Sequence, residues 1–379
     1  MTVNFSQLSK DKNQLEDGAE IGLLDKINAY LAQMQRVPFK EKLFFVQHLS
    51  IMLKAGISLS SAIKTLSVQS SNKLFSSVLI EISSNVERGV SFSESLKPYE
   101  KIFSELFINM VEAGEISGKL EDVLAQLFLQ LKKQNELISK VKGALTYPAV
   151  IIFAMGGIGI FMMIAVVPKI TEMLTSFNAE LPLATKILIG VSGALAKHGI
   201  LVLIGVIIFI FIASRILNTY KGKYYFQSFV FLIPGVSNVV KEINLARFSR
   251  TISSLLKTDI AIIKSFQITA NVLTNLHYRE ALNAMGDQIK KGGQINEVVK
   301  NFPKLFPPTV TQMIAVGEQT GELDTILGEL AEFYESEVDM LMSNLPSIIE
   351  PLLILVLGCG IGGMAVAIIM PMYSITANV

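Results

Sequence analysis

Three stretches of the chain carry almost no charge and are long enough to cross a membrane as helices. Residues 149–167 contain no charged residue, and a helix of that length spans about 28 Å, close to the hydrocarbon thickness of a bilayer. The second stretch, residues 199–214, is shorter, but the apolar run 187–196 could extend it with Lys197 reaching toward the interface. The third, residues 352–370, is again charge-free. Because backbone groups in lipid must be satisfied internally, each stretch is predicted to be a helix.

Outside these stretches the apolar positions also follow a helical period. From Leu120 to Leu131 they recur at i, i+3, i+4, i+7, i+8 and i+11, and the same phase returns from Leu323 to Tyr334. Strand-like alternation is not evident. The polar parts are therefore predicted to be compact antiparallel helical bundles.

Helix ends are also marked in the sequence. Ser91 and Glu94 fit a capping box, in which each side chain satisfies a free backbone amide near the other. The corresponding residues further along the chain are Gln294 and Glu297, which predict a weaker cap. Gly89 stands where a preceding helix would end in a left-handed residue.

The chain repeats itself without a gap at an offset of 203 positions, the distance from Phe45 to Phe248. The densest match sets VEAGEISGKLEDVL (from Val111) against IAVGEQTGELDTIL (from Ile314). Other identical pairs are Lys54 with Lys257, Ile57 with Ile260, Gly89 with Gly292, Glu94 with Glu297, Phe103 with Phe306, Met110 with Met313, Pro148 with Pro351 and Pro168 with Pro371. Each copy is a polar part followed by one apolar stretch.

Like copies should enter the membrane from the same side, so the middle stretch is needed to bring the chain back. Lysines flank the first stretch on its N-terminal side, at positions 132, 133, 140 and 142, and Arg215, Lys221 and Lys223 follow the second. Because positive charge favours the cytoplasmic side, both polar parts and the N-terminus are predicted to be cytoplasmic. The polar start of the chain lacks the pattern of a cleaved secretion signal.

The predicted fold is an all-α membrane protein with two repeated cytoplasmic antiparallel helical bundles and three transmembrane helices. Its predicted parts are an N-terminal polar extension (1–38), the first bundle (39–148), the first transmembrane helix (149–168), a short extracytoplasmic segment (169–198), the second transmembrane helix (199–214), the second bundle (215–351), the third transmembrane helix (352–371) and an extracytoplasmic tail (372–379).

Composition excludes several functions. Hydrophobic residues make up 51% of the chain and charged residues 17%, which is unusual for a soluble protein, and the net charge of +1 provides no field to hold nucleic acid. The single cysteine, Cys359, excludes an internal disulfide framework and a cysteine-cluster metal site. His48, His198 and His277 lie in different parts of the chain, and no catalytic motif is present. The sequence therefore predicts no enzyme, no cofactor and no metal.

The repeated G-E-x-[ST]-G-x-L element is the strongest local motif. It comprises Gly114, Glu115, Gly118 and Leu120 in the first copy and Gly317, Glu318, Gly321 and Leu323 in the second. A phosphate-binding loop needs four residues between its glycines and a hydroxyl after its lysine, and this element has neither. We interpret it as a tight turn in which Ser117 or Thr320 and the adjacent glycine cap the next helix, and as a candidate contact for a partner.

Acidic residues cluster in the second copy. They could bind a divalent cation or a basic partner, or form a solvated helix face, and they are Glu318, Glu322, Asp324, Glu329, Glu332, Glu335, Glu337 and Asp339. Glu335 is equivalent to Lys132 in the first copy, so opposite charges at equivalent places could help the bundles pair.

Candidate positions also lie at the membrane boundary. Glu350 precedes Pro351 and is equivalent to Tyr147, which precedes Pro148. A carboxylate at membrane depth is either functional or an interfacial group favoured by the dipole near the start of a helix. Within the third apolar stretch, Gly358 and Gly362 form a small-xxx-small pair that predicts close helix association, within one chain or between chains.

Over residues 39–371 the chain resembles the family of type II secretion F-proteins and type IV pilus inner-membrane platform proteins. The segments that carry the resemblance are FFVQHLSIMLKAGISLSSAI (from Phe44), RGVSFSESL (from Arg88), GEISGKL (from Gly114), TYPAV (from Thr146), GEQTGELDTIL (from Gly317), IEPLLIL (from Ile349) and IIMPMYS (from Ile368). Two departures affect local turns: Asp259 replaces the glycine found at Gly56, and Lys169 follows Pro168 where an aromatic residue is usual.

The resemblance implies a platform in the cytoplasmic membrane that is a homo-oligomer in contact with membrane lipid. Its implied partners are a cytoplasmic assembly ATPase, pilin or pseudopilin subunits and other inner-membrane assembly proteins. Residues 114–122 and 317–325 are the preferred ATPase contacts. The alternative is a small transporter or permease with duplicated domains, although three spans are few for a transport pathway and charged pathway residues are missing from them.

Overall fold

The computed structural model describes residues 37–175 and 183–377, and all regular structure in these ranges is helical. The chain forms two compact units, residues 1–128 and residues 129–379. The helices of the first unit are α3 (Phe39–Lys54), α4 (Leu59–Gln69), α5 (Lys73–Glu87), α6 (Phe92–Leu96), η1 (Lys97–Tyr99), α7 (Glu105–Ser117) and the start of α8 (Leu120–Phe161). The N-terminal extension predicted at 1–38 lies almost wholly outside the described residues.

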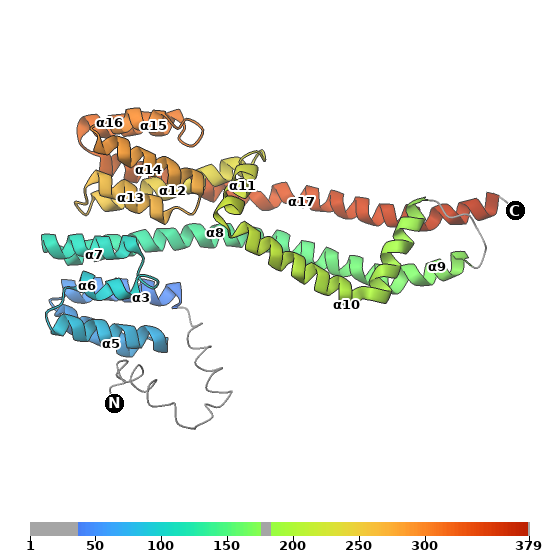
Figure 1. Ribbon diagram of the computed structural model, residues 1–379, viewed down its shortest axis with the longest axis horizontal. Helices are drawn as coiled ribbons and strands as arrows, with labels where there is room; N and C mark the ends of the chain where they lie inside the picture. The colour runs from blue at the N-terminus through green and yellow to red at the C-terminus, as the bar shows by residue number, and fades with distance from the viewer. Residues whose placement is uncertain (1–36, 176–182, 378–379) are drawn as a thin grey trace, which may run out of the picture. The chain divides into compact units, whose positions relative to one another are not determined.

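The second unit continues from α8 and contains the remaining helices (Figure 1). They are η2 (Met162–Val166), α9 (Val167–Thr175), α10 (Leu183–Leu217), α11 (Tyr220–Val230), α12 (Val236–Leu256), α13 (Ile262–Val272), α14 (Leu276–Lys290), α15 (Ile295–Lys300), α16 (Pro308–Thr320) and α17 (Leu323–Ala377). Helices α3 to α8 therefore correspond to α12 to α17, and five of these six pairs begin at equivalent residues. The all-α fold and the two repeats are confirmed.

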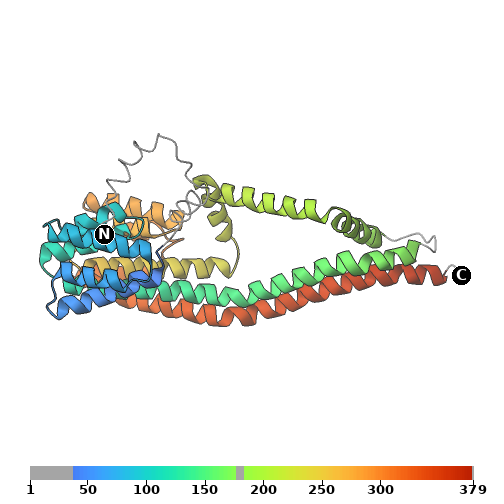
Figure 2. The same cartoon turned by 90° about the horizontal axis from the view of Figure 1, so that it is seen from below.

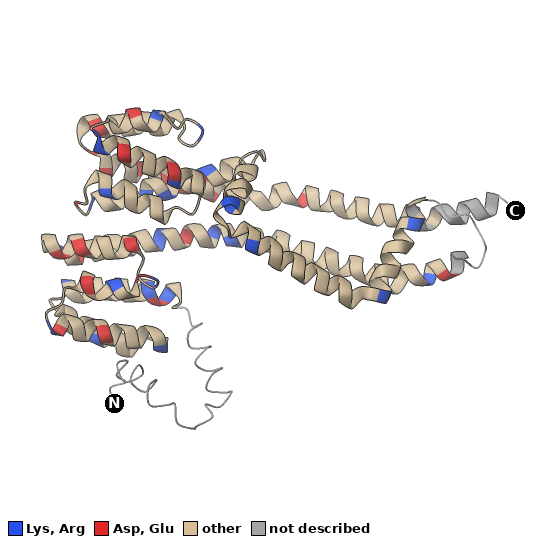
Figure 3. Cartoon of the chain, viewed as in Figure 1, with Lys and Arg blue, Asp and Glu red and all other residues tan. Residues whose placement is uncertain are grey.

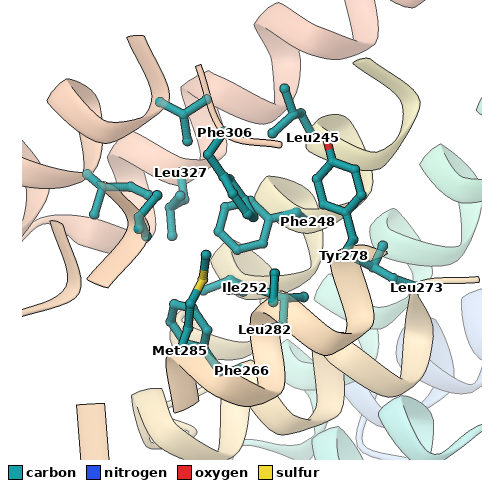
Figure 4. Packing of buried hydrophobic residues seen from close by; sticks show 14 of the residues in the cluster. Leu245, Phe248, Ile252, Phe266, Leu273, Tyr278, Leu282, Met285, Phe306 and Leu327 are labelled. Atoms are coloured by element: carbon teal, nitrogen blue, oxygen red, sulfur yellow. The ribbon is translucent and has the colours of Figure 1, made fainter. Parts of the chain in front are cut away.

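Each unit is built around a trio of aromatic rings at equivalent positions. In the first, the rings of Phe45, Phe75 and Phe103 lie with centroids 5.7 to 6.1 Å apart. In the second, Phe306 lies 5.1 Å from Phe248 and 5.5 Å from Tyr278. Figure 4 shows these three side chains directed toward one another. Edge-to-face packing of such rings stabilises a core beyond the area that it buries.

The turns of the repeat keep their backbone conformation even where the residue changes. Gly89 and Gly292 have φ of 88° and 90° after α5 and α14, as predicted. Asp259 has φ of 59° where Gly56 has 81°, so the departure from glycine leaves the turn left-handed. Aspartate tolerates this conformation better than most residues because its short polar side chain can bond locally.

The predicted boundaries between bundle and membrane are not breaks in the helices. Helix α8 continues through a π-helical turn, Met162–Val166, into α9, and α17 runs without interruption from Leu323 to Ala377. The Ser192 hydroxyl of α10 donates to the carbonyl of Met163, 2.6 Å away, which satisfies an acceptor at the π-turn. The first compact unit ends at Phe128, so residues 129–148 of the predicted first bundle belong to the second unit.

Three helical stretches are long and apolar enough to cross a membrane, as predicted. They are Leu120–Glu172, Thr185–Leu217 and Leu323–Ala367, and Figure 3 shows their apolar parts nearly free of charge. The middle one is kinked at His198, whose φ of −123° and ψ of 23° are not helical. Helix α10 begins at Leu183, so it includes the apolar run 187–196 that could extend the second stretch. Residues 183–198 of the predicted segment 169–198 are thus part of this kinked helix.

Within the second unit the two long helices α8 and α17 run parallel and side by side (Figure 2). Lys133 lies 3.3 Å from Glu335, Lys140 pairs with Asp339, and Leu137 packs with Val338. Contacts therefore advance along both helices in the same direction. The sequence argument that the apolar ends of the two copies point the same way agrees with this geometry.

Candidate functional site

The repeated G-E turn joins α7 to α8 in the first unit. Helix α7 ends at Ser117, and Gly118 closes it in the left-handed conformation with φ of 69°. A Cβ on Gly114 would lie 3.0 Å from the Cβ of Val123, so only glycine lets the two helices approach this closely. The predicted tight turn is present, and its glycines serve the turn and the close helix contact.

The second copy builds the same turn between α16 and α17. Gly321 has φ of 74°, and a Cβ on Gly317 would lie 3.0 Å from the Cα of Leu323. The hydroxyl of Thr320 donates to the carbonyl of Val316 at 2.9 Å and accepts from the amide of Glu322 at 3.4 Å.

The hydroxyl in the first copy does not cap the next helix. Ser117 Oγ donates back to the carbonyl of Ala113, 2.8 Å away, so it stabilises the end of α7. We had expected this hydroxyl to cap α8, and that interpretation is wrong for Ser117. The physical reason is that α7 ends in unpaired carbonyls, which need donors, and the hydroxyl lies within their reach.

The glutamate of the motif caps a helix more than twenty residues earlier in the chain. Both carboxylate oxygens of Glu115 accept backbone amides at the start of α6, from Phe92 at 2.5 Å and Ser93 at 2.8 Å. Glu318 does the same at the start of α15, with Ile295 at 2.7 Å and Asn296 at 3.1 Å. A carboxylate at a helix N-terminus satisfies free donors and meets the positive end of the helix dipole.

This contact corrects the capping box proposed from Ser91 and Glu94. Ser91 Oγ does accept the amide of Glu94 at 3.3 Å, but the Glu94 carboxylate pairs with Lys97 instead of returning to Ser91. In the second copy, Gln294 makes no side-chain cap. The local pattern predicted the helix start correctly, but its main acceptor comes from a distant residue.

At the G-E turn of the first unit, Glu115 caps α6 and the neighbouring side chain is exposed instead. Ile116 is 82% exposed, and Gln319, its equivalent in the second copy, is also exposed. Ile116 is thus the accessible apolar side chain of the turn that the sequence analysis names as a candidate contact for a partner. The residues at this turn therefore divide into a structural part, the buried Gly114 and half-buried Glu115 with their mates, and an exposed rim, which is Ile116 in the first copy and Gln319 in the second.

A buried polar cluster that the sequence did not reveal joins α8 to α12 and α17 in the second unit. Gln130, on α8, donates to Thr251 Oγ1 at 3.2 Å and accepts from Ser254 Oγ at 2.9 Å. Arg250 makes a two-pronged contact with Glu335, at 2.7 and 2.9 Å. The signal that could have found it is the run of polar residues inside α12, Ser249 to Ser254, which is too long for one solvated face.

Charges at equivalent places pair differently from the expectation. Lys132 is exposed, and it is its neighbour Lys133 that reaches Glu335. Three members of the acidic series are held by the fold, since Glu318 caps α15, Glu335 binds Arg250 and Asp339 binds Lys140. In the described part of the chain no group of three or more His, Cys, Asp or Glu residues could hold a metal.

At the predicted membrane boundary the two copies differ. Pro148 is buried inside α8, whereas Pro351 and Glu350 are exposed on α17. Because α17 begins at Leu323, Glu350 lies in a helix interior and not near a helix start. The explanation of Glu350 by the helix dipole is therefore wrong, because the dipole acts within the first turn.

The small-residue face of α17 is open in this chain. A Cβ on Gly358 or Gly362 would meet no described atom within 4 Å, and Cys359 beside them is exposed. Helix association at this face stays a prediction.

The histidines lie in unrelated settings. His48 stacks on Phe44 at 3.8 Å, and His198 marks the kink of α10. The Nε2 of His277 lies 3.0 Å from Ser228 Oγ, and burial lowers the pKa of this histidine. Ser228 also donates to the carbonyl of Tyr224 at 2.9 Å, so its proton is directed away from the imidazole and the pair is not an activated nucleophile.

A cavity of about 870 Å³ opens beside this pair in the second unit. Its walls come from the C-terminal end of α11, from α12 and α14, and from the loop before α16. They include Phe231, Ala281 and Phe302 with Lys241 and Lys304. The lining is mainly apolar. Ser228, His277 and Glu280 all line it. Ser228 donates to the carbonyl of Tyr224 and Glu280 accepts from the hydroxyl of Tyr220, so the three do not form a relay of acid, base and nucleophile.

Comparison with known proteins gives the same two-copy organisation. The family model described as type II secretion system (T2SS), protein F, matches residues 45–168 and 248–371. Similar proteins include the type IV pilus assembly protein PilC of Thermus thermophilus, 35% identical over 90% of this chain and 84% of its own length. The type IV pilus assembly protein PilC of Myxococcus xanthus is 30% identical over 90% of this chain and 81% of its own.

A protein named for a secretion system matches over nearly the same region. The type II secretion system protein F of Vibrio cholerae is 29% identical over 86% of this chain and 80% of its own length. The family model covers most of each polar part, both G-E turns and the first and third apolar stretches. The chain therefore belongs to the type II secretion system protein F family.

Proposed function

We propose that this chain is a non-catalytic platform in the inner membrane of a type II secretion or type IV pilus machine, as the names of its relatives suggest. In this proposal a cytoplasmic assembly ATPase acts on the helical bundles, and the membrane helices pass the movement to pilin or pseudopilin subunits. The N-terminus and both bundles lie in the cytoplasm.

The observation that carries the proposal is the continuity of α8 and α17. Each helix begins at a G-E turn and continues into an apolar stretch without a break. An unbroken helix transmits force along its axis, whereas a flexible linker would absorb it. The ion pairs from Lys133 and Lys140 to α17 hold the two helices in step within the second unit.

The exposed rim of the first G-E turn is the preferred ATPase contact. Ile116 is 82% exposed at the end of α7, four residues before α8 begins at Leu120, so a partner bound to this turn would act at the start of the long helix. Gln319 occupies the equivalent place on the second bundle. The two positions form a matched pair for deciding which bundle binds.

A crosslinking experiment tests this contact. A photoreactive residue is placed at Ile116 or at Gln319 in the full-length protein, and the membranes are irradiated with the candidate ATPase present. We expect an adduct from position 116. A control at Val68, which is 83% exposed on α4, should give none. Absence of adducts from both turns would remove the proposed contact.

The topology has a separate test. Reporter tags inserted after residue 90 and after residue 290 should both report the cytoplasm. Tags on opposite sides of the membrane would contradict the coupling of two cytoplasmic bundles. The pure protein should hydrolyse no ATP; it should instead co-purify with the ATPase and a pilin-like subunit.

A further inference from the structure

Helix α11 carries its apolar side chains on the outside. Four large side chains of this helix and its C-terminal end are 49% to 77% exposed, namely Tyr225, Phe226, Phe229 and Leu232. At helical spacing these residues lie on one side. A helix on the surface of a soluble domain turns its apolar side inward, so this arrangement is inverted.

The inner side of α11 is held by specific contacts to the neighbouring helix α14. Gln227 accepts the amide of Leu276 at 2.7 Å, and Ser228 lies 3.0 Å from the imidazole of His277. Tyr224 packs its ring on the same imidazole at 4.3 Å. The outward side is therefore fixed, because rotation of α11 would break these contacts.

A rigid corner places α11 at the end of a membrane span. Helix α10 ends at Leu217 and α11 begins at Tyr220, after a turn visible in Figure 1. Thr219 Oγ1 donates to the carbonyl of Ile216 at 2.6 Å and accepts the amide of Gly222 at 3.2 Å. A Cβ on Gly222 would lie only 2.0 Å from the Ile216 oxygen, so the corner requires glycine.

The charges around this helix are positive. No acidic residue occurs in the sequence between Glu180 and Glu242, whereas Arg215, Lys221 and Lys223 flank the corner. Figure 3 shows these cations gathered where α10 meets α11. One acid from another helix, Glu280 of α14, lies beside the corner, and its carboxylate accepts a hydrogen bond from the hydroxyl of Tyr220.

The aromatic and basic composition of α11 is not found at the equivalent place before the first bundle. The repeat offset sets residues 17–27 opposite α11, and that segment has three acidic residues and no aromatic residue. The aromatic and basic character of α11 is therefore a property of its place in the chain and not of the repeat.

We propose that α11 is an interfacial helix, which lays Tyr225, Phe229 and Leu232 into the headgroup region of the bilayer. Lys221 and Lys223 bind the phosphates of anionic lipids. Tyrosine and phenylalanine suit this region because their rings are apolar, while a lysine stem lies along the apolar side and its ammonium reaches phosphate. Three observations favour lipid over a protein partner: the corner with α10, the cations and the missing acids.

This anchor adds to the attachments that the second bundle has through the spans in α10 and α17. A helix lying in the interface would fix the angle between the bundle and the membrane. This inference does not depend on the identity of any partner. It can be tested independently of the proposed platform function.

Tryptophan fluorescence tests the proposal, because the chain contains no tryptophan. The full-length variants F229W and F333W are reconstituted in nanodiscs of phosphatidylcholine with phosphatidylglycerol, with or without lipids brominated near the headgroup. The two side chains are similarly exposed, at 59% and 51%, but Phe333 lies on α17 far from its apolar stretch. We expect brominated lipid to remove most of the F229W emission and little of the F333W emission.

Each other result decides against the proposal. Emission from F229W that is red and unquenched would place the side chain in water. Blue-shifted but unquenched emission would mean that protein covers it. F226W provides a second reporter on the same side, should F229W fold poorly.

The charge component has its own control. The double variant K221Q/K223Q in the F229W background should lose quenching in anionic discs, whereas K290Q/K291Q, a pair of exposed lysines at the end of α14, should not. Equal quenching of all three proteins, or equal quenching with phosphatidylcholine alone, would overturn the assignment of the lysines to anionic lipid.

Discussion

The equivalent helices α3 and α12 present the same face to different surroundings. On α12 this face carries Arg250 and Ser254, which are buried and bonded to Glu335 of α17 and Gln130 of α8, respectively. On α3 the equivalent face carries Phe44 and Ile51, which are 41% and 56% exposed. The apolar residues are outside and the polar residues are inside, the reverse of the usual rule. The repeat therefore preserves a skeleton of turns and caps, while each copy adapts its outer faces to different neighbours.

The largest effect should come from exchanging residues at equivalent positions on this face. Ser254→Ile removes the hydroxyl that bonds Gln130 and forces a larger side chain into a packed contact, so we expect a loss of about 2 to 3 kcal/mol. Ile51→Ser should change stability by less than about 0.5 kcal/mol, because the site is exposed. Hydrogen exchange of peptides from each bundle measures both. Similar losses in the two variants would contradict the comparison.

A smaller effect, equal in the two bundles, should follow loss of the motif glutamates. Glu115→Ala frees the amides of Phe92 and Ser93, and Glu318→Ala frees their counterparts on α15. We expect each variant to lose about 1 to 2 kcal/mol of local stability, seen as faster exchange in α6 or α15. Glu94→Ala is the control, since that carboxylate only pairs with the exposed Lys97. A difference of more than twofold in free energy between the copies would show that the caps are not equivalent.

The equivalent carbonyls of Ile102 and Leu305 are satisfied by unrelated donors. Lys42 Nζ reaches the first at 3.1 Å, and the hydroxyl of Tyr278 reaches the second at 2.8 Å. Tyr278→Phe should cost about 1 kcal/mol, because it leaves a buried acceptor unpaired. Lys42→Met should cost less, because burial already lowers the pKa of this lysine and opposes its charge. Chemical unfolding monitored by bundle-specific exchange separates the two, and a larger loss for Lys42→Met would reverse the interpretation.

The smallest effect concerns Glu242, a half-buried residue of α12. Burial and, to a lesser degree, the nearby Glu337 raise the pKa of its carboxyl above the ordinary 4.5. Because the folded state then binds the proton more tightly than the unfolded state, this group's contribution to stability falls as the pH rises from about 4.5 through the raised value. Glu242→Gln should remove this dependence and match or exceed the stability of the parent at neutral pH. Thermal unfolding across that pH range provides the measurement, and a variant less stable at neutral pH would refute it.

The sequence allowed the repeat, the all-helical fold and the three apolar spans to be predicted, because each depends on local pattern. Hydrophobic period, glycine at left-handed turns and the absence of charge over a membrane's thickness act within short stretches of chain. The aspartate at position 259 was expected to affect its turn, but its backbone is left-handed like that of Gly56.

The site was predicted less completely. The sequence predicted the G-E turns but not the role of Glu115. The carboxylate of Glu115 accepts the amides of Phe92 and Ser93, which lie more than twenty residues earlier, and spacing within a short stretch of sequence cannot predict such a contact. Residue offset indicated Lys132 as the mate of Glu335, whereas Lys133 makes the contact. Successive residues of a helix are rotated by about 100° around its axis. The repeat offset therefore does not show which of two neighbouring side chains faces the partner helix.

By itself the amino-acid order determined where helices form, where they turn and which stretches suit lipid, since these follow from the free energies of neighbouring groups. Only the tertiary structure decided which donors meet which acceptors across the repeat, that α12 buries its polar side under α8, and that α11 turns its aromatic side outward. Those outcomes depend on how helices distant in the chain pack, and a residue's burial is a property of that packing and not of its neighbours in sequence.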